Sequence, residues 1–442
     1  MRRPKKHLSF GSLLTVMSEV FEGIPDSRQE GKIDYSLRDA MMCGFAMMFF
    51  QDPSMLQFQT RMKEEYNSCN LETIFGVKSI PSDTQIRDII DTVNPENFDP
   101  IFKSYTARLQ RGKHLEQYQL FPGLYAIPID GSEYFSSNKI HCPGCLEKKH
   151  TNGTISYAHQ ILQAAIVHPG MRQVIPLMAE EIRNTDGNKK QDCEINAAKR
   201  LLRKIRTVHP QLGIIIIGDG LYSKQPAIDL MEMLRLHYIL VAKEKDHKFM
   251  MEYLEERENQ EKIYKKEFTD EKNRRHVYEW INDVPLFAFE FTVHVNFFRY
   301  RMIVTDENGK EKTTYKNSWV TDLEITEENI ETMVKGGRAR WKIENECFNN
   351  LKNQGYHIEH NYGHGSQHLS FNFLMLILLA FFFHQIFELT DRTFQAIREK
   401  SSRREMWNNF RSYIKLILFR DWEQLLKFAF SPARFDLRLD TS

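Results

Sequence analysis

Residues 212–220, LGIIIIGDG, carry the clearest fold signal in this chain. The unbroken apolar run is typical of a strand that is buried on both faces inside an α/β sheet. The run stops at Asp219, which is followed by glycine. A carboxylate at the end of such a strand lies where α/β sheets place their ligands and chemistry. The stretch therefore predicts an α/β core with Asp219 at its functional edge.

A second stretch has the same form, because the short apolar run 125–129 is followed by Asp130 and Gly131. We expect this strand to end at Asp130, with Gly131 permitting a sharp exit and a close approach of substrate. Asp-Gly is also a common turn dipeptide, so neither aspartate alone separates a catalytic site from an ordinary turn. Further strands are predicted at 160–167, 173–178 and 238–241, and a helix is predicted at 192–209. This order of elements is that of a mixed α/β sheet.

Glu344 is the third acidic candidate, and it lies on a helix predicted over 338–352. On a helical wheel Glu344 falls inside an apolar arc, with Arg340 one turn earlier. Glu346 points to the opposite, polar side. A buried carboxylate is costly unless it is paired or binds metal. Two interpretations stay open, a buried Glu344–Arg340 ion pair and a metal ligand.

Three carboxylates from two strands and a helix suit two divalent cations. Mg²⁺ prefers hard oxygen ligands and keeps waters and phosphate oxygens in its shell. Two such ions, roughly 4 Å apart, activate the attacking oxygen and stabilise the leaving oxygen in phosphodiester chemistry. We therefore expect two Mg²⁺ ions, replaceable by Mn²⁺, at Asp130, Asp219 and Glu344.

The residues around these acids resemble the DDE transposases of bacterial insertion sequences. The matching stretches are IDGSEYF at 129–135, IGDG at 217–220 and RWKIENE at 340–346. The resemblance spans about 125–360 and is to the insertion-sequence-4-like group, which has a β-rich insertion ahead of the Glu helix. It implies a ribonuclease H-like mixed sheet with Asp130, Asp219 and Glu344 as the metal-binding triad.

The family often spaces Tyr, Arg, Glu and Lys through the Glu helix. Arg340 and Glu344 keep that spacing, whereas Gly337 takes the Tyr position and Lys352 lies one residue beyond the Lys position. In related enzymes an insertion Trp stacks on a flipped base, and Trp319 is near that place, although its setting is typical of a core strand. The candidate DNA contacts are Arg338, Arg340, Lys352, Trp319, His360 and His364.

The resemblance implies an enzyme that cuts double-stranded DNA at the ends of its mobile element. The freed 3′-hydroxyl would then be joined to target DNA, with the protein acting as a homodimer in the DNA complex. Two other functions stay open, a metal-dependent nuclease without strand transfer and a DNA-binding protein with an inactive core. The presence of all three acids argues against the inactive core.

The pattern of apolar and polar residues divides the chain into five segments. Residues 1–120 are predicted to be helical, as a DNA-binding region or a packing domain. Residues 121–246 and 316–364 are the two parts of the predicted catalytic domain. Residues 247–315 are predicted to form the β-rich insertion, and 365–442 a helical C-terminal region.

Composition and charge are those of an ordinary globular protein, with 41% hydrophobic residues, 27% charged residues and a net charge of +1. DNA binding would therefore depend on local basic clusters, at 2–6, 272–275 and 398–415, each of which is equally typical of a solvated face. Six cysteines and an N-terminus without a signal-peptide core favour a reducing cytosol, and the resemblance implies that this cytosol is prokaryotic. The apolar run 373–383 is too short to span a membrane.

The sequence HCPGC at 141–145, followed by His150 and His159, has partial zinc spacing. A single CxxC favours a loop with free thiols. A structural Zn²⁺ at this place would take Cys142, Cys145 and His150 as ligands. Histidines also follow the Glu helix, at positions 357, 360, 364 and 368, where phosphate contact and a plain polar loop both fit.

Overall fold

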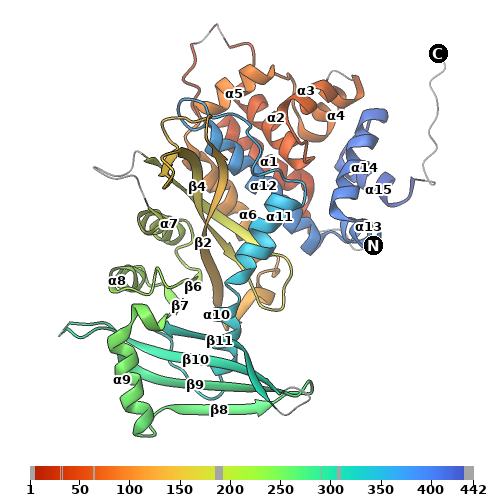
Figure 1. Ribbon diagram of the computed structural model, residues 1–442. Coiled ribbons are helices and arrows are strands. Elements are labelled where there is room, and N and C mark those ends of the chain that lie inside the picture. Colours follow the sequence, from red (N-terminus) through yellow and green to blue (C-terminus); the bar gives the residue numbers. More distant parts are fainter. Residues whose placement is uncertain are drawn as a thin grey trace.

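The computed structural model describes residues 5–432 except 30, 32, 63, 64, 185–192, 290 and 306–309. A long mixed sheet runs through the protein, with a body of helices at one end (Figure 1). The predicted α/β fold with a ribonuclease H-like mixed sheet is confirmed. Arg2, Arg3 and the predicted start of a helix at 192 lie outside the described residues.

Five strands in the order β5-β4-β2-β6-β7 form the centre of the sheet. Strand β2 runs parallel to β6, and β6 runs parallel to β7, whereas β4 is antiparallel to both β2 and β5. The strands are β2 (Leu124–Ser137), β4 (Ile155–Ile166), β5 (Ile175–Ile182), β6 (Gly213–Gly218) and β7 (His237–Val241), with β1 (Gln119–Phe121) and β3 (Leu146–Lys149) at their margins.

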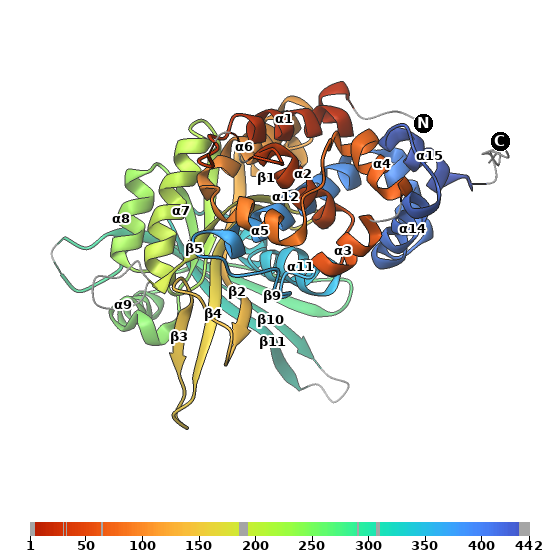
Figure 2. The same ribbon diagram turned by 90° about the horizontal axis from the view of Figure 1, so that it is seen from above.

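Two helices connect these strands. Helix α7 (Glu194–Val208) lies between β5 and β6 in the sequence, and α8 (Gln225–Met233) lies between β6 and β7. The buried residues of α7, among them Ala198, Leu202 and Ile205, recur every three or four positions. This spacing gives α7 one apolar face, which packs against β4 and β5. Figure 2 shows α7 and α8 together on one side of the molecule.

The sheet continues beyond β7 into the segment predicted to be β-rich. Four antiparallel strands, β8 to β11, extend it, and β11 pairs directly with β7 through Trp319 and Val241. A helix, α9 (Lys248–Asn259), precedes them, so the segment begins with helix and not with strand. The strands are β8 (Tyr264–Thr269), β9 (Arg274–Pro285), β10 (His294–Thr305) and β11 (Glu311–Thr321).

The helical body is built around α12 (Leu369–Thr390), which contains the apolar run 373–383. Among the described residues α12 is the helix that is long and apolar enough to cross a membrane, but 83% of its apolar window is buried inside the protein. It is therefore the core helix of this body. Figure 2 shows helices from the start of the chain around it, with helices from the end of the chain beside them.

Helices from both ends of the chain share one aromatic core. The ring of Phe10 lies 5.1 Å from that of Trp422 and 5.8 Å from that of Phe383, between ring centroids. The first region thus packs into the helical body, and its predicted role in DNA binding stays a prediction. Its helices are α1 (Phe10–Glu22), α2 (Leu37–Phe49), α3 (Met55–Met62), α4 (Glu65–Phe75), α5 (Asp83–Asp91) and α6 (Asp99–Arg111), and those after α12 are α13 (Arg392–Lys400), α14 (Arg403–Leu416) and α15 (Trp422–Phe430).

Asp91, the last residue of α5, caps the N-terminus of α12. Its carboxylate accepts backbone N–H bonds from Ser366 at 2.7 Å, His368 at 2.9 Å and Leu369 at 2.8 Å. No side chain at the N-cap position of α12 does this. Burial raises the pKa of Asp91, but the amide hydrogen bonds outweigh it, and the net pKa lies below the usual value. The charge also faces the positive end of the helix.

We predict that Asp91→Asn lowers the free energy of unfolding by about 2 kcal/mol at pH 7, because hydrogen bonds to a charged acceptor are lost. A lowered pKa in the folded state stabilises the protein above the pKa of the unfolded carboxyl, about 4, and this stabilisation disappears as pH falls through the folded pKa. The difference in the free energy of unfolding between wild type and variant should therefore disappear at acidic pH, as measured by urea unfolding at several pH values.

Asp88→Asn is the matched control, because Asp88 is exposed on the same helix. It should change stability by less than about 0.5 kcal/mol. Equal losses in the two variants would show that Asp91 is not a cap.

Candidate active site

Asp130 and Asp219 occupy equivalent positions on neighbouring strands. The last parallel pair of β2 and β6 joins Pro128 to Ile217, and each aspartate lies two residues further on. The prediction that the first strand ends at Asp130 is wrong, since β2 continues to Ser137. It continues because its other neighbour, β4, goes on pairing with it, with Gln163 opposite Asp130. Only β6 turns away at this point.

Glu344 reaches the same pocket from the helical segment that follows the insertion. The acidic side chains Asp130, Asp219 and Glu344 line this pocket with Arg340 and Lys352. Its other lining residues are Gly131, Ser132, Asn345, Phe348 and Asn349, and Glu346 is not among them. Three acids from distant parts of the sequence therefore share one open, polar hollow.

One regular helix was predicted for 338–352, but the segment that carries Glu344 is not a single regular α-helix. Helix α10 (Ile330–Arg338) is followed by a turn, then by a π-helix, η6 (Ile343–Phe348), and by α11 (Asn349–Asn353). The N–H of Asn349 bonds the carbonyl of Glu344, five residues back. This wide turn breaks the constant 100° step of a helical wheel. Glu344 is therefore exposed to the pocket, and its predicted place in a buried arc is wrong.

The π-turn also explains the displaced lysine. One extra residue in the turn carries Lys352 to the pocket that Glu344 lines, while Leu351 is fully buried. Lys352 forms an ion pair with the exposed Glu359, with 3.0 Å between Nζ and Oε1. The one-residue departure from the family spacing is thus compensated by the backbone.

Arg340 pairs with Asp130 and not with Glu344. Its Nη1 lies 3.2 Å from Oδ2 of Asp130. Burial raises the pKa of Asp130 to about 6; Arg340 opposes this rise, and the charges of Glu194, Asp219 and Glu344 add to it. The pocket therefore carries more negative charge than its own cations offset, which is the condition that favours divalent metal ions.

Glu194, at the start of α7, is an acidic neighbour that the sequence analysis missed. A Cβ on Gly131 would lie 2.7 Å from Oε2 of Glu194, so any larger residue there would require this carboxylate to shift. The hydroxyl of Tyr222 donates to Oε1 of Glu194 at 2.6 Å. Gly131 was expected to permit a close approach of substrate. In the structure the group that lies close to Gly131 is the carboxylate of Glu194. Nothing in the local sequence marks Glu194.

Trp319 is fully buried on β11, with its ring stacked 5.2 Å from that of Phe298. The prediction that Trp319 contacts DNA is therefore wrong, because no face of the indole is open. A Cβ on Gly337 would lie 2.7 Å from Nε1 of Trp319. The indole thus occupies the space beside the family's Tyr position. Trp341, by contrast, is 45% exposed.

We predict that Gly337→Ala lowers the free energy of unfolding by about 1–3 kcal/mol, because the added methyl overpacks the indole of Trp319. Gly11→Ala is the control, since Gly11 is also helical but has nothing within 4 Å of an added Cβ. It should stabilise the protein by up to about 1 kcal/mol. Denaturant unfolding of both variants measures this, and equal effects would contradict the close contact.

The other candidate DNA contacts lie outside the acidic pocket. The Arg338 guanidinium sits 4.5 Å from the ring centroid of Tyr315, and His360 is exposed beside Tyr362. His364 turns toward Cys142, Cys145 and His159, and the ligand atoms of these four residues all lie within 4.8 Å of one another.

His150 is not part of that group, which corrects its assignment as a zinc ligand. Its Nε2 lies 2.8 Å from the hydroxyl of Ser156. His150 sits past the end of β3, whereas His159 lies on β4 beside the thiols. His159, and not His150, therefore lies beside the two thiols.

Several residues of the predicted basic clusters serve the protein's own structure. Arg274 pairs with Asp270 at 2.6 Å, and Arg403 is buried against Glu388 at 2.7 Å. Arg404 lines a hollow of the helical body, and the other basic residues around this hollow are Arg61, Arg411 and Lys415. The basic character of these segments therefore overstates the charge that is available to a partner.

A family model described as a transposase DDE domain matches residues 146–382, more than half of the chain. The match includes Asp219, Glu344 and the four strands beyond β7, while Asp130 lies ahead of it. No curated protein matches the chain.

Proposed function

Since the chain belongs to the transposase DDE domain family, we propose that it cuts double-stranded DNA at the ends of a mobile element and joins the freed 3′ ends to target DNA. The observation that carries this proposal is the shared pocket of Asp130, Asp219 and Glu344. Two neighbouring strands and one helical segment supply these acids, from positions 214 residues apart in sequence at the extremes. A family member that had lost its chemistry would not need to keep this arrangement.

We propose that the three carboxylates hold two Mg²⁺ ions, or Mn²⁺ in their place. The residues fit such ions, because carboxylate oxygens are the preferred ligands of Mg²⁺ and because the pocket sets three carboxylates against the two cations Arg340 and Lys352. When bound, two ions activate the attacking oxygen and stabilise the leaving oxygen of a phosphodiester. Below about pH 6 Asp130 takes up a proton, so metal affinity should fall there.

The cationic residues of the pocket are proposed to position DNA. Arg340 now neutralises Asp130, and a guanidinium suits bidentate contact with a phosphate entering beside it. Among the described residues the ion-pair partner of Lys352 is the exposed Glu359, and a DNA phosphate can replace this partner at little cost. Trp341 replaces Trp319 as the aromatic candidate for contact with a base, because its ring is partly open to solvent.

The wider partners are also proposals. The family resemblance supports a homodimer in the DNA complex, acting in a prokaryotic cytosol where chromosome and target DNA are found. The hollow in the helical body that is lined by the exposed residues Arg404 and Lys415 is the candidate surface for DNA outside the active site.

Glu344→Gln should abolish cleavage while DNA binding is retained, because the charge of the ligand is lost and its shape is kept. We expect the rate of Mg²⁺-dependent nicking of element-end DNA to fall more than about a hundredfold, or about 2.7 kcal/mol of barrier. Glu346→Gln, two residues away and outside the pocket, should cut like wild type. Full activity of the Glu344 variant would overturn the assignment.

A joining assay separates the proposed function from its alternatives. Wild type is given a precut element end and a supercoiled plasmid, and covalent joining of the two is measured. Cutting without joining would identify a nuclease. An absence of cutting by folded, DNA-bound wild type would identify an inactive DNA-binding core.

Lys352→Gln should weaken the binding of element-end DNA and reduce the slope of log affinity against log salt by about 1, because one phosphate contact is lost. Lys335→Gln, on the exposed side of α10, should leave both quantities unchanged. Fluorescence anisotropy at several salt concentrations measures them. The same slope in both variants would place Lys352 away from the DNA.

A further inference from the structure

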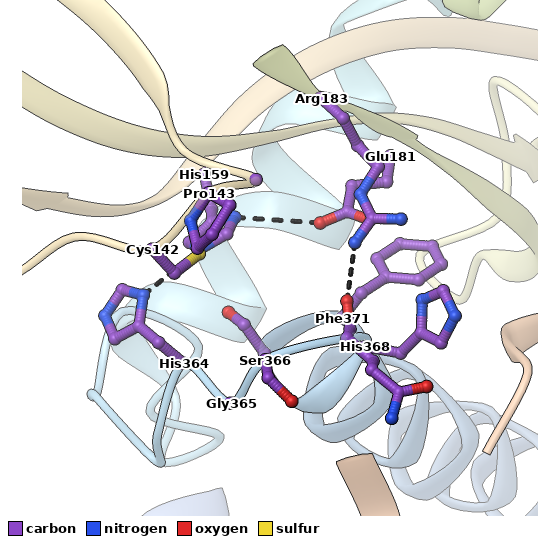
Figure 3. A pocket seen from close by; sticks show the side chains of 13 residues that line it. Cys142, Pro143, His159, Glu181, Arg183, His364, Gly365, Ser366, His368 and Phe371 are labelled. Atoms are coloured by element: carbon purple, nitrogen blue, oxygen red, sulfur yellow. Dashed lines mark hydrogen bonds and ion pairs between the residues drawn. The ribbon is translucent and has the colours of Figure 1, made fainter. Parts of the chain in front are cut away.

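Four metal-ligating side chains meet outside the acidic pocket. Cys142 and Cys145 come from the turn between β2 and β3, His159 from β4, and His364 from the loop between α11 and α12. Their ligand atoms all lie within 4.8 Å of one another. Figure 3 shows His159 and His364 on either side of Cys142. We propose that these four residues bind one structural Zn²⁺ ion.

The distances between the ligand atoms are those of a tetrahedron around zinc. The two Sγ atoms are 3.7 Å apart, and Nε2 of His159 is 3.2 Å from Nδ1 of His364. Three sulfur–nitrogen distances are 3.3, 3.4 and 3.9 Å. With Zn–S about 2.3 Å and Zn–N about 2.05 Å, tetrahedral geometry requires edges of about 3.8, 3.3 and 3.6 Å for the three kinds of pair.

The surroundings suit thiolate and imidazole ligands. In the CxxC turn the backbone N–H of Cys142 points at Sγ of Cys145, 3.4 Å away, and would stabilise a thiolate there. Nδ1 of His159, the ring atom that faces away from the thiols, lies 3.6 Å from the Glu181 carboxylate, as drawn in Figure 3. A carboxylate behind a ligating histidine fixes its orientation and raises its basicity. Cys145 and His159 are almost completely buried.

Zinc explains this arrangement better than a disulfide does. A disulfide would need the sulfur atoms about 2.05 Å apart, whereas the two Sγ atoms are 3.7 Å apart and both thiols are free. Soft sulfur ligands with imidazole select zinc over Mg²⁺. Four protein ligands leave no open position, so the site is structural and not catalytic.

The bound ion would connect segments that are remote in sequence and close to the active site. His159 is opposite Phe135 on β2, the strand that carries Asp130. His364 lies on the loop that leads out of the Glu344 segment toward α12. Zinc would therefore pin this loop to the catalytic sheet, and its binding energy would add to the stability of the whole chain.

The test is the metal content of the full chain, purified without chelator and assayed without DNA or added Mg²⁺. Wild type should hold one zinc per chain by mass spectrometry. Cys142→Ser and His364→Asn should lose it, whereas the matched variants Cys193→Ser and His150→Asn should keep it, because Cys193 is exposed elsewhere and His150 bonds Ser156. Chelation should lower the melting temperature of wild type and leave that of Cys142→Ser unchanged.

Cobalt substitution keeps the proposal testable if a variant does not fold. Co²⁺ added to chelated wild type should give the intense visible bands of tetrahedral coordination and a thiolate charge-transfer band. Wild type without zinc and without these bands, zinc retained in both ligand variants, or a Cys142–Cys145 disulfide in protein purified under reducing conditions would each overturn the proposal. None of these results depends on whether the protein cuts DNA.

Discussion

The burial of α12 is the constraint on which the rest of the structure depends. Its residues from Phe373 to Phe383 are apolar and buried without a break, so no side of the helix can face water. Covering it takes helices from both ends of the chain and strand β5 of the sheet. The two terminal regions therefore form one body through it, and the catalytic sheet is packed against that body.

The beginning of α12 is also where the helical body meets the catalytic sheet. Asp91 holds the amides of Ser366 to Leu369 from the side of the body. The group of Cys142, Cys145, His159 and His364 lies on the side of the sheet. Its member His364 comes just before the capped residues in the sequence. The loop between the Glu segment and α12 is thus fastened at two points, and one of them would be strengthened by a metal ion.

Charge and backbone geometry shape the active site together. The parallel register of β2 and β6 sets Asp130 and Asp219 side by side, and repulsion among carboxylates contributes to the raised pKa of Asp130. Arg340 offsets part of this charge. The π-turn at Ile343–Phe348 exposes Glu344 and directs Lys352 into the same hollow. A regular helix would have placed Leu351, which is buried here, at the position that Lys352 occupies in the pocket.

Local pattern in the sequence was enough to predict the isoleucine strand before Asp219 and the order of strands and helices, because strand burial and chain order are recorded in neighbouring residues. The metal-binding role of the three acids came from the family resemblance and stays a prediction. Tertiary structure alone decided which distant groups meet. Glu194 reaches Gly131, Trp319 fills the space beside Gly337, and His159 and His364 replace His150 beside the thiols. The π-turn also escaped prediction, since a helical wheel assumes a constant step. These contacts join residues far apart in sequence, and their geometry depends on packing that no local pattern records.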